Sequence, residues 1–308
     1  FDEKVHDAVS GERRIESLRI DPKEDLGIQI AVQSQALIQE KFNQTELKII
    51  SEKKGKFDFI VCCRMLEHAY EPVELIKGIS LLLATDGKLI VEVPDSKKPL
   101  EQADIAMLWE EHISYFTKNT LVNCMERNGF VCVETMLCEY PQEDALIGVF
   151  VMSDEVDDIS VNKSYLGNII SEMDLARRYA DKIVYLKSIM TEYLSELIEK
   201  FGEIVLFGAG HRGVLFLNLM GISSDFVRHV IDDDPNKRNL RVPGSGVLIK
   251  NSDSVCYDEV GVCIFSVSLD AEELIVKKIK ALAGKNIEFY SISPDSNYAL
   301  PIIINEFS

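Results

Sequence analysis

The chain has 308 residues, with 33 lysines and arginines against 51 aspartates and glutamates, so its formal net charge is −18. This length predicts about two domains of ~100–200 residues each, and the acidic balance disfavours nucleic acid as a partner, because a polyanion is repelled. Hydrophobic residues make up 46% and charged residues 27%, which is the composition of a folded globular protein and not of a disordered one.

Targeting and cysteine patterns indicate a cytoplasmic protein. No apolar run approaches the ~20 residues that cross a bilayer, and the first residues lack the plan of a signal peptide, so no membrane partner is expected. The seven cysteines form no C-x-x-C pair, and most lie in apolar, strand-like stretches. We expect reduced cysteines in the core and no metal site, because clustered ligand spacing is absent.

The first half of the chain predicts alternating strands and helices. The expected strands are 57–63, 88–94, 130–134 and 145–152, and the expected helices are 71–83 and 117–128. Thr117 is the expected N-cap of the second helix, and Gly129 suits the left-handed position that ends it. This order predicts a parallel or mixed sheet covered by helices on both faces.

A long proline-free segment, from about residue 161 to 201, follows an acidic stretch at 154–158. The expected apolar stripe of this helix is Ile169, Met173, Ala176, Ala180, Ile183, Met190, Leu194 and Leu197. We favour a connecting helix packed on its neighbours over a free-standing dimeric coiled coil, because only about four heptads are present. The predicted domains are therefore 1–158 and 203–308, joined by a helix at 159–202.

The second half predicts a smaller Rossmann-like sheet. The expected strands are 204–207, 226–231, 262–266 and 287–292, and the expected helices are 214–220 and 271–282. The predicted fold class is α/β, with two Rossmann-like α/β/α domains joined by a long helix.

A glycine turn at 208–213 is the most regular motif in the chain. Its spacing is G-x-G-x-x-G, it lies between a strand and a helix, and an acid ends the next strand about 20 residues on, as a dinucleotide site requires. The candidate ligand-binding residues are Gly208, Gly210, His211, Arg212, Gly213 and Asp232. A turn that only packs a strand against a helix, and binds nothing, carries about equal weight.

Two groups of titratable residues in the first half are candidates for chemistry. The segment 64–68 follows the strand 57–63 at its carboxyl end, where ligands bind in open α/β folds, with a solvated helical turn as the alternative. The segment 109–117 holds a histidine, two glutamates, a tyrosine and the only tryptophan within nine residues. His112 is the best general-base candidate, with Glu111 orienting it or acting as the base; a histidine that caps a helix is the alternative.

The order of these segments carries a family resemblance. In the first half the segments are 57–61, 65–68, 87–95, 112–117 and 128–130, and in the second half they are 208–213, 231–237 and 242–244. The first set resembles class I S-adenosylmethionine-dependent methyltransferases. The second set resembles the C-terminal domain of sugar C-methyltransferases, which act on nucleotide-linked deoxy-keto sugars. The resemblance covers about residues 55–300.

This resemblance implies S-adenosylmethionine as cofactor and a small-molecule substrate, a nucleotide sugar, bound between the two domains. It implies methylation at carbon by base-assisted enolate formation. The catalytic residues it implies are His112, Glu111 and Tyr115, and the cofactor-binding residues are Asp21, Cys63, Arg64, Met65 and His68. The family loop reads Tyr-His-Glu-His where this chain has Trp-Glu-Glu-His at 109–112, which leaves the substrate and the methylated atom open.

Two family features are missing from the chain: a zinc domain with paired cysteines, and the glycine-rich loop after the first strand, which would precede residue 1 if Asp21 ends the second strand. A catalytically degenerate binding or assembly protein and an NAD-dependent oxidoreductase remain as alternatives, and the oligomeric state is open. An anionic substrate requires local positive charge, which we expect at His211, Arg212, Lys237, Arg238 and Arg241.

Overall fold

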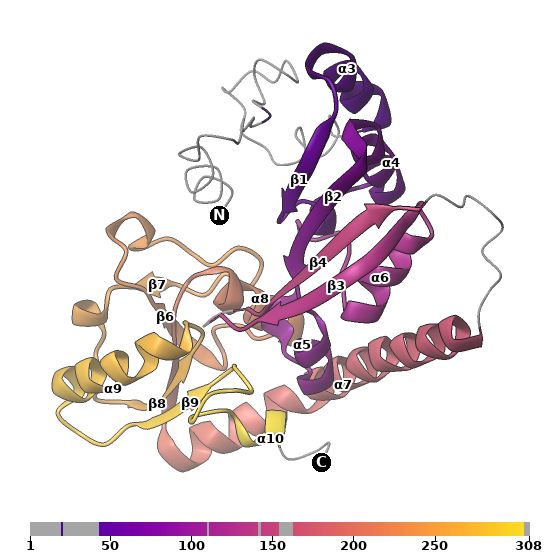
Figure 1. The fold of residues 1–308 in the computed structure, drawn as a ribbon. Coiled ribbons are helices and arrows are strands. Elements are labelled where there is room, and N and C mark those ends of the chain that lie inside the picture. Colours follow the sequence, from indigo (N-terminus) through magenta and orange to yellow (C-terminus); the bar gives the residue numbers. More distant parts are fainter. Residues whose placement is uncertain (1–19, 21–42, 110, 141–142, 154–162, 305–308) are drawn as a thin grey trace. The chain divides into compact units, whose positions relative to one another are not determined.

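The computed structural model describes residues 20, 43–109, 111–140, 143–153 and 163–304 (Figure 1). The chain divides into two compact units. The first consists of Phe1–Lys97 and Glu110–Glu172, and the second of Lys98–Trp109 and Met173–Ser308. A short segment, Lys98–Trp109, therefore belongs to the second unit although its neighbours on both sides belong to the first.

The first unit contains a four-stranded mixed sheet. Its elements are α3 (Gln44–Lys54), β1 (Phe57–Cys63), the short 3-10 helix η1 (Leu66–His68), α4 (Pro72–Leu82), β2 (Leu83–Pro94), α6 (Lys118–Glu126), β3 (Phe130–Cys138) and β4 (Ala145–Met152). The strand order is β1-β2-β4-β3. Strands β1 and β2 are parallel, and β4 runs antiparallel to both of its neighbours, so the expected mixed sheet is confirmed.

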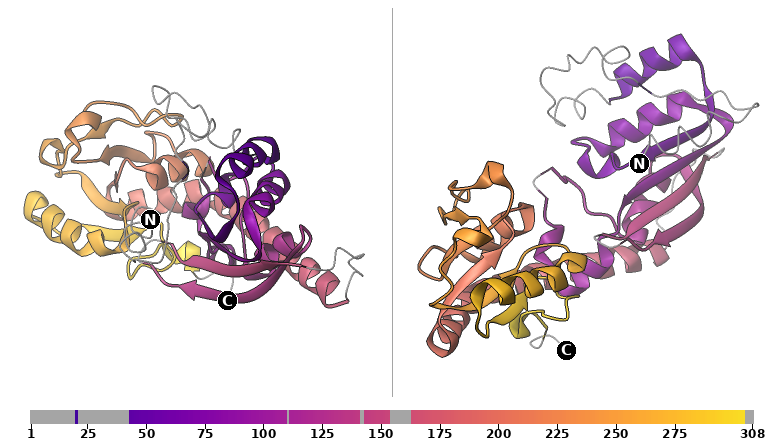
Figure 2. Two further views of the ribbon diagram at one scale, coloured as in Figure 1. Left: turned by 45° about the horizontal axis from the view of Figure 1, so that its top comes forward. Right: turned by 90° about the vertical axis from the view of Figure 1, so that its left-hand side faces the viewer.

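Local sequence explains how α6 is placed against this sheet. Thr117 is its N-cap, and Thr117 and Thr120 form a reciprocal capping box, which satisfies two backbone N–H groups at the helix start. Gly129 follows with φ +86°, the left-handed conformation expected from the sequence. The helix then buries Leu121 and Met125 against β3 and β4, shown in magenta in Figure 2.

The second unit contains a five-stranded parallel sheet. Its elements are α5 (Lys97–Gln102), η2 (Ile105–Met107), α7 (Lys163–Phe201, shared with the first unit), β5 (Glu203–Phe207), α8 (His211–Met220), β6 (Val227–Ile231), η3 (Pro235–Lys237), β7 (Ile249–Lys250), η4 (Ser252–Ser254), β8 (Val260–Phe265), α9 (Leu269–Ala283), β9 (Glu288–Ser291) and α10 (Pro301–Ile304). The strand order is β7-β6-β5-β8-β9, and every pair is parallel. The predicted α/β class and Rossmann-like arrangement are confirmed; β7 was not predicted.

Helix α7 has 39 residues and matches the predicted long helix within two residues. Its buried stripe is Leu175, Tyr179, Ile183, Leu186, Met190, Leu194 and Leu197. The predicted stripe is therefore wrong in its first half, where Met173, Ala176 and Ala180 are exposed. Residues spaced by strict heptads move gradually around the surface of a straight helix, which has 3.6 residues per turn. The buried residues of α7 instead keep to one side of the helix, so they depart from the heptad spacing.

The seven cysteines are all free, as expected. Cys62 and Cys263 lie in the core, but Cys256 is exposed and is not the core residue that the sequence indicated. Among the described helices, none has the length and apolar character needed to cross a membrane.

Candidate functional site

The first group of candidate residues lies at the carboxyl end of β1. Arg64 follows the last residue of the strand with φ +52°, a left-handed conformation that is uncommon outside glycine and often marks a functional site. Its backbone N–H donates to Glu92 O at 2.9 Å. The guanidinium donates to Glu92 Oε1 at 3.2 Å and to Glu143 Oε2 at 2.6 Å. These contacts fix the turn that leads into η1.

The loop that carries the predicted base is anchored on η1. Ile113 N and Ser114 N both donate to the backbone oxygen of Glu67, at 2.8 and 3.0 Å. His68 Nδ1 donates to the backbone oxygen of Glu111 at 2.9 Å. Because a carbonyl oxygen only accepts, this contact places the proton of a neutral His68 ring on Nδ1 and leaves the lone pair on Nε2.

The same loop also crosses the end of β2. Phe116 forms a bridge with Asp95, and Ser96 N donates to Phe116 O at 2.8 Å. The ring of His112 lies edge-on against His68 and Tyr115, with centroid distances of 4.8 and 6.1 Å. The structure thus brings His68, His112 and Tyr115 together at the carboxyl ends of two parallel strands, where open α/β sheets bind their ligands.

Glu67 is a member of this cluster that sequence reasoning did not select. It is 1% exposed, and neither side-chain oxygen has a hydrogen-bond partner. Burial raises the pKa of the carboxyl to about 7. The nearest basic atom is His68 Nε2, 3.9 Å from Oε1. A glutamate before a histidine reads as a solvated helical turn in sequence, and only the fold shows that it points into the protein.

Glu67, His68 and His112 also offer the side-chain chemistry of a metal site. Their potential ligand atoms lie within 4.8 Å of one another. Atoms bound to one zinc ion at ~2.0–2.2 Å lie at most about 4.4 Å apart, so this cluster is wider than a formed coordination sphere. We therefore describe it by its capacity to exchange protons.

The remaining cofactor-binding candidates surround the same strand end. Cys63, Arg64 and Met65 are half-buried, so each leaves surface that a ligand can cover. Asp21, the expected partner of a ribose, lies outside the described residues, as does Glu110.

The glycine turn at 208–213 lies where the strand order of the second sheet reverses. The chain moves from β5 outward to β6 and β7, then returns to β8 on the other side of β5, and such a switch point is a ligand site in open α/β sheets. Gly208 has φ +114°, and a Cβ added to Gly213 would lie 2.3 Å from Gly208 O. A Cβ at Gly210 would meet nothing within 4 Å. Packing therefore requires glycine at the first and third positions but not at the second.

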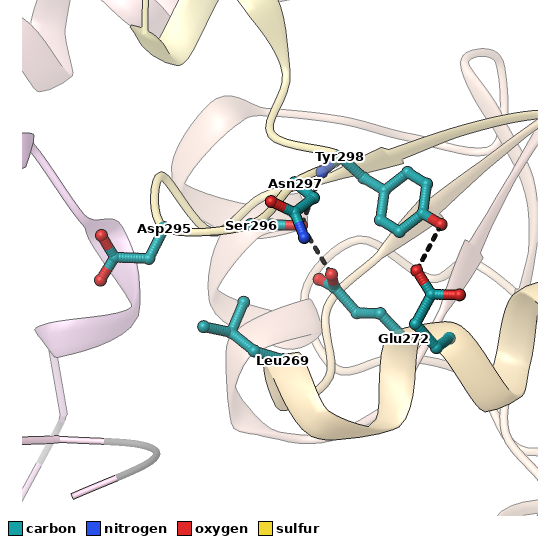
Figure 3. Close-up of a pocket in the computed structure, with 7 residues that line it drawn as sticks. Leu269, Glu272, Asp295, Ser296, Asn297 and Tyr298 are labelled. Carbon is teal, nitrogen blue, oxygen red and sulfur yellow. Dashed lines mark hydrogen bonds between the residues drawn. The ribbon is translucent and has the colours of Figure 1, made fainter.

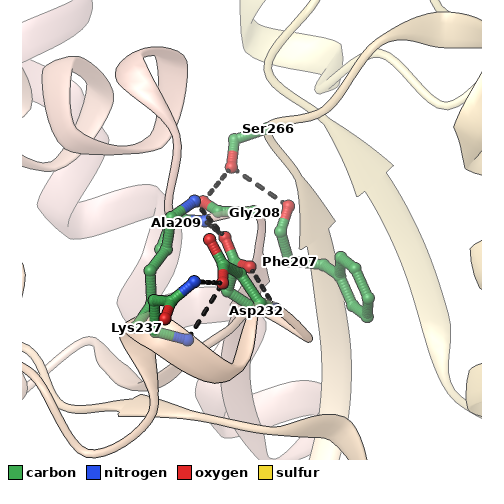
Figure 4. A network of polar contacts seen from close by, with 8 residues as sticks. Phe207, Gly208, Ala209, Asp232, Lys237 and Ser266 are labelled. Carbon is green, nitrogen blue, oxygen red and sulfur yellow. Dashed lines mark hydrogen bonds and ion pairs between the residues drawn. The ribbon is translucent and has the colours of Figure 1, made fainter.

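Asp232 closes the turn from the end of β6 (Figure 4). Its Oδ2 accepts from Ala209 N and Lys237 Nζ, both at 2.9 Å, and its Oδ1 accepts from Asp234 N at 3.0 Å. Burial alone would raise the pKa of this carboxyl, but these donors together lower it. The carboxylate already has three donors from the protein, so the oxidoreductase hypothesis, which needs it for a cofactor ribose, gains no support here.

The predicted cationic residues near the turn are mostly held by the protein. His211 Nε2 donates to Leu108 O at 2.7 Å, and its ring stacks on Trp109 with centroids 4.0 Å apart. Arg212 donates to Val267 O at 3.4 Å. Lys237 pairs with Asp232, Arg241 donates to Gly246 O, and Arg238 is exposed.

A separate pocket in the second unit is lined by Leu269, Glu272, Glu273, Asp295, Ser296, Asn297 and Tyr298 (Figure 3). Glu272 is buried and accepts from Ser291 and Ser296. Glu273 accepts from the hydroxyl of Tyr298. Because these acids have partners within the protein, we assign the pocket no chemistry.

Two family models match the chain. The model described as a methyltransferase domain matches residues 11–135, and the model described as the C-methyltransferase C-terminal domain matches residues 155–294. Each model covers less than half of the chain, so the two halves are similar to methyltransferase domains one by one. The resemblance to methyltransferases that was expected from the sequence is thus found in both halves of the chain.

Individual relatives of this chain are distant. C-methyltransferase NovU from Streptomyces niveus is 22% identical over 207 residues, which are 65% of this chain and 49% of the relative, so the chain spans about half of that protein's length. Partial structural likeness, each over 32% of this chain, is found to two methyltransferases. They are the 1,6-didemethyltoxoflavin-N1-methyltransferase of Burkholderia thailandensis (16% identity, TM-score 0.27, 45% of that chain) and the magnesium protoporphyrin IX methyltransferase of Synechocystis PCC 6803 (18%, 0.26, 46%).

Proposed function

We propose that this chain is a methyltransferase that uses S-adenosylmethionine to methylate a carbon atom of a small molecule. The match of the second half to a C-methyltransferase C-terminal domain supports transfer to carbon. The observation that carries the proposal is the cluster of His68, His112 and Tyr115 at the carboxyl ends of β1 and β2. Carbon is a poor nucleophile unless a proton is first removed, and this cluster is suited to remove one.

His112 is the proposed general base. Its loop is held by the two hydrogen bonds to Glu67 O, so the ring is positioned before a substrate arrives. Removal of a proton from the carbon beside a keto group gives an enolate, and the Tyr115 hydroxyl is the proposed donor to its oxygen. Glu111 orients the base indirectly, because its backbone oxygen fixes the His68 ring on which His112 lies.

The carboxyl end of β1 is the proposed cofactor edge. Cys63, Arg64 and Met65 fit a ligand there, since they are half-buried and Arg64 holds a left-handed backbone that bends the chain across the strand end. Together with His68 and Asp21 they form the proposed binding set. S-adenosylmethionine supplies an electrophilic methyl group, which the enolate carbon accepts.

A nucleotide-linked keto sugar is the proposed substrate, with its diphosphate at the turn 208–213. The turn precedes the ten-residue helix α8, whose N-terminal N–H groups favour an anion. Gly210 supports this role, because no packing contact explains a glycine at that position. The candidate binding residues remain those expected from the sequence, with Gly208, Gly213 and Asp232 shaping the turn.

The deciding experiment measures proton abstraction and methyl transfer separately. The full chain is incubated in D2O with S-adenosylhomocysteine and a panel of nucleotide-linked keto sugars, and deuterium at the carbon beside the keto group is followed by NMR. Methyl transfer is then measured with S-adenosylmethionine, and cofactor binding by calorimetry. Exchange and transfer with one substrate support the proposal. No cofactor binding at millimolar concentration contradicts it and favours the degenerate binding protein.

A further inference from the structure

The buried carboxyl of Glu67 lacks a hydrogen-bond partner inside the candidate site. A carboxyl group removed from water without a partner costs several kcal/mol, and a charged one costs more. Both oxygens of Glu67 are in this situation at 1% exposure. An arrangement this unfavourable persists when a neighbouring group or the reaction itself compensates it.

His68 is the group that can compensate it. Nδ1 of His68 is committed as a donor to Glu111 O, so Nε2 either carries a lone pair or, in the cation, a proton. This atom lies 3.9 Å from Glu67 Oε1, within reach of a hydrogen bond after a small side-chain rotation. One proton satisfies both groups. If the pair holds no proton, the negative carboxylate faces the lone pair of His68 Nε2, and the two repel. If it holds two protons, the O–H of Glu67 faces the N–H of His68, and neither has an acceptor.

We propose, on the basis of the proposed function, that Glu67 is the positioning residue of the base, sharing one proton with His68 and stabilising the cation that forms at His112. Proton abstraction moves a proton from the substrate carbon to the His112 imidazole, and the electron pair stays on the enolate. The new cation lies beside His68, whose ring centroid is 4.8 Å away. The proton shared by Glu67 and His68 can then move toward the carboxyl, which keeps His68 neutral beside the new cation and leaves the net charge of the cluster unchanged.

The other charged groups around Glu67 do not neutralise it. Arg64 favours the ionised carboxyl, but it is bonded to Glu92 and Glu143, and both of these oppose that effect. Burial raises the pKa of the Cys62 thiol to about 12, so this thiol stays protonated and supplies no charge. Glu67, whose pKa burial raises to about 7, is therefore a carboxyl that can hold a proton at neutral pH and share it with His68.

Glu67→Gln tests the proposal because glutamine keeps the shape and removes the charge. We expect kcat to fall on the order of 100-fold with little change in KM, and the limb of the kcat profile near pH 7 to disappear. Glu67→Asp keeps a carboxylate in a worse shape and recovers part of kcat and the pH limb. If Glu67 has only a structural role, kcat follows the reverse order, with Glu67→Gln close to wild type and Glu67→Asp lower. That result would overturn the proposal. Glu74→Gln, an exposed carboxylate of α4, controls for net charge.

A second measurement does not depend on activity. Histidine ring NMR on the full chain without cofactor follows the protonation and tautomers of His68 and His112 with pH. If His68 and His112 titrate together in wild type and independently in Glu67→Gln, the proposal is supported. This holds even if no methyl transfer is found and the proposed function fails. Methyl transfer that is equal in both proteins, or a stoichiometric divalent metal retained by wild type and absent from Glu67→Gln, overturns it.

Discussion

Gly210→Ala separates ligand binding from folding in the glycine turn. Gly210 has φ −89°, which alanine adopts readily, and its added Cβ would meet nothing within 4 Å. Alanine restricts the unfolded chain, which stabilises by ~0.4–1 kcal/mol, and a poorer N-cap costs a similar amount. The net stability change is therefore within about 1 kcal/mol, or ~2–4 °C in Tm. A diphosphate that approaches this backbone would, however, meet the new methyl group.

We expect Gly210→Ala to weaken binding of a nucleoside diphosphate at least tenfold, about 1.4 kcal/mol, by calorimetry with UDP and dTDP. Gly213→Ala is the matched control for packing. Its Cβ would lie 2.3 Å from Gly208 O, so it should lower the free energy of unfolding by the ~1–3 kcal/mol typical of overpacking. Unchanged affinity in a folded Gly210→Ala protein would refute a diphosphate site at this turn and leave the glycines as packing residues.

Three further predictions follow from named contacts. His112→Ala should reduce deuterium incorporation by 10²–10⁴-fold while calorimetric S-adenosylmethionine binding is retained; undiminished exchange would assign the base elsewhere. Asp232 has a lowered pKa when folded, so its ionised form stabilises above about pH 4 and that stability is lost on acidification. Between pH 5 and pH 2.5, Tm should therefore fall more steeply with decreasing pH for wild type than for Asp232→Asn. Thr117→Ala should cost about 1–2 kcal/mol in urea unfolding, since it removes the cap of α6 and a 2.9 Å bond to Glu172.

Strand and helix positions were predictable wherever local chemistry decides them. The continuous apolar run at 145–152 and the cap at Thr117 predicted β4 and the start of α6. The apolar stripe of α7 was half wrong, because Leu175 and Tyr179 are selected by what they pack against and not by spacing alone. Tyr179, for example, donates to Asp104 O, in a segment 75 residues earlier in the chain.

The sequence was enough to predict which residue types form the candidate site. It was not enough to predict which side chains touch, or that the carboxyl of Glu67 is buried with a raised pKa. His68 and His112 are 44 positions apart in sequence, and their contact depends on backbone bonds from Ile113 and Ser114 to Glu67 O. No side-chain pattern encodes such bonds. The burial of Glu67 is likewise a property of the assembled sheet end, so a residue that reads as solvated in sequence becomes the carboxyl with the raised pKa.

The density of polar residues at 109–117 has a structural reason beyond catalysis. Trp109 ends the segment assigned to the second unit, where it stacks on His211 at the start of α8. Glu111 and His112 belong to the first unit and hold the proposed base. Trp109 therefore packs within the second unit, and His112 lies in the cluster proposed for proton abstraction in the first unit. The family's tyrosine is replaced by Trp109, which packs on His211 within the second unit, and its Glu-His pair is kept where the chemistry is proposed. The tryptophan at position 109 can thus be explained by packing on His211, without a change in the proposed reaction.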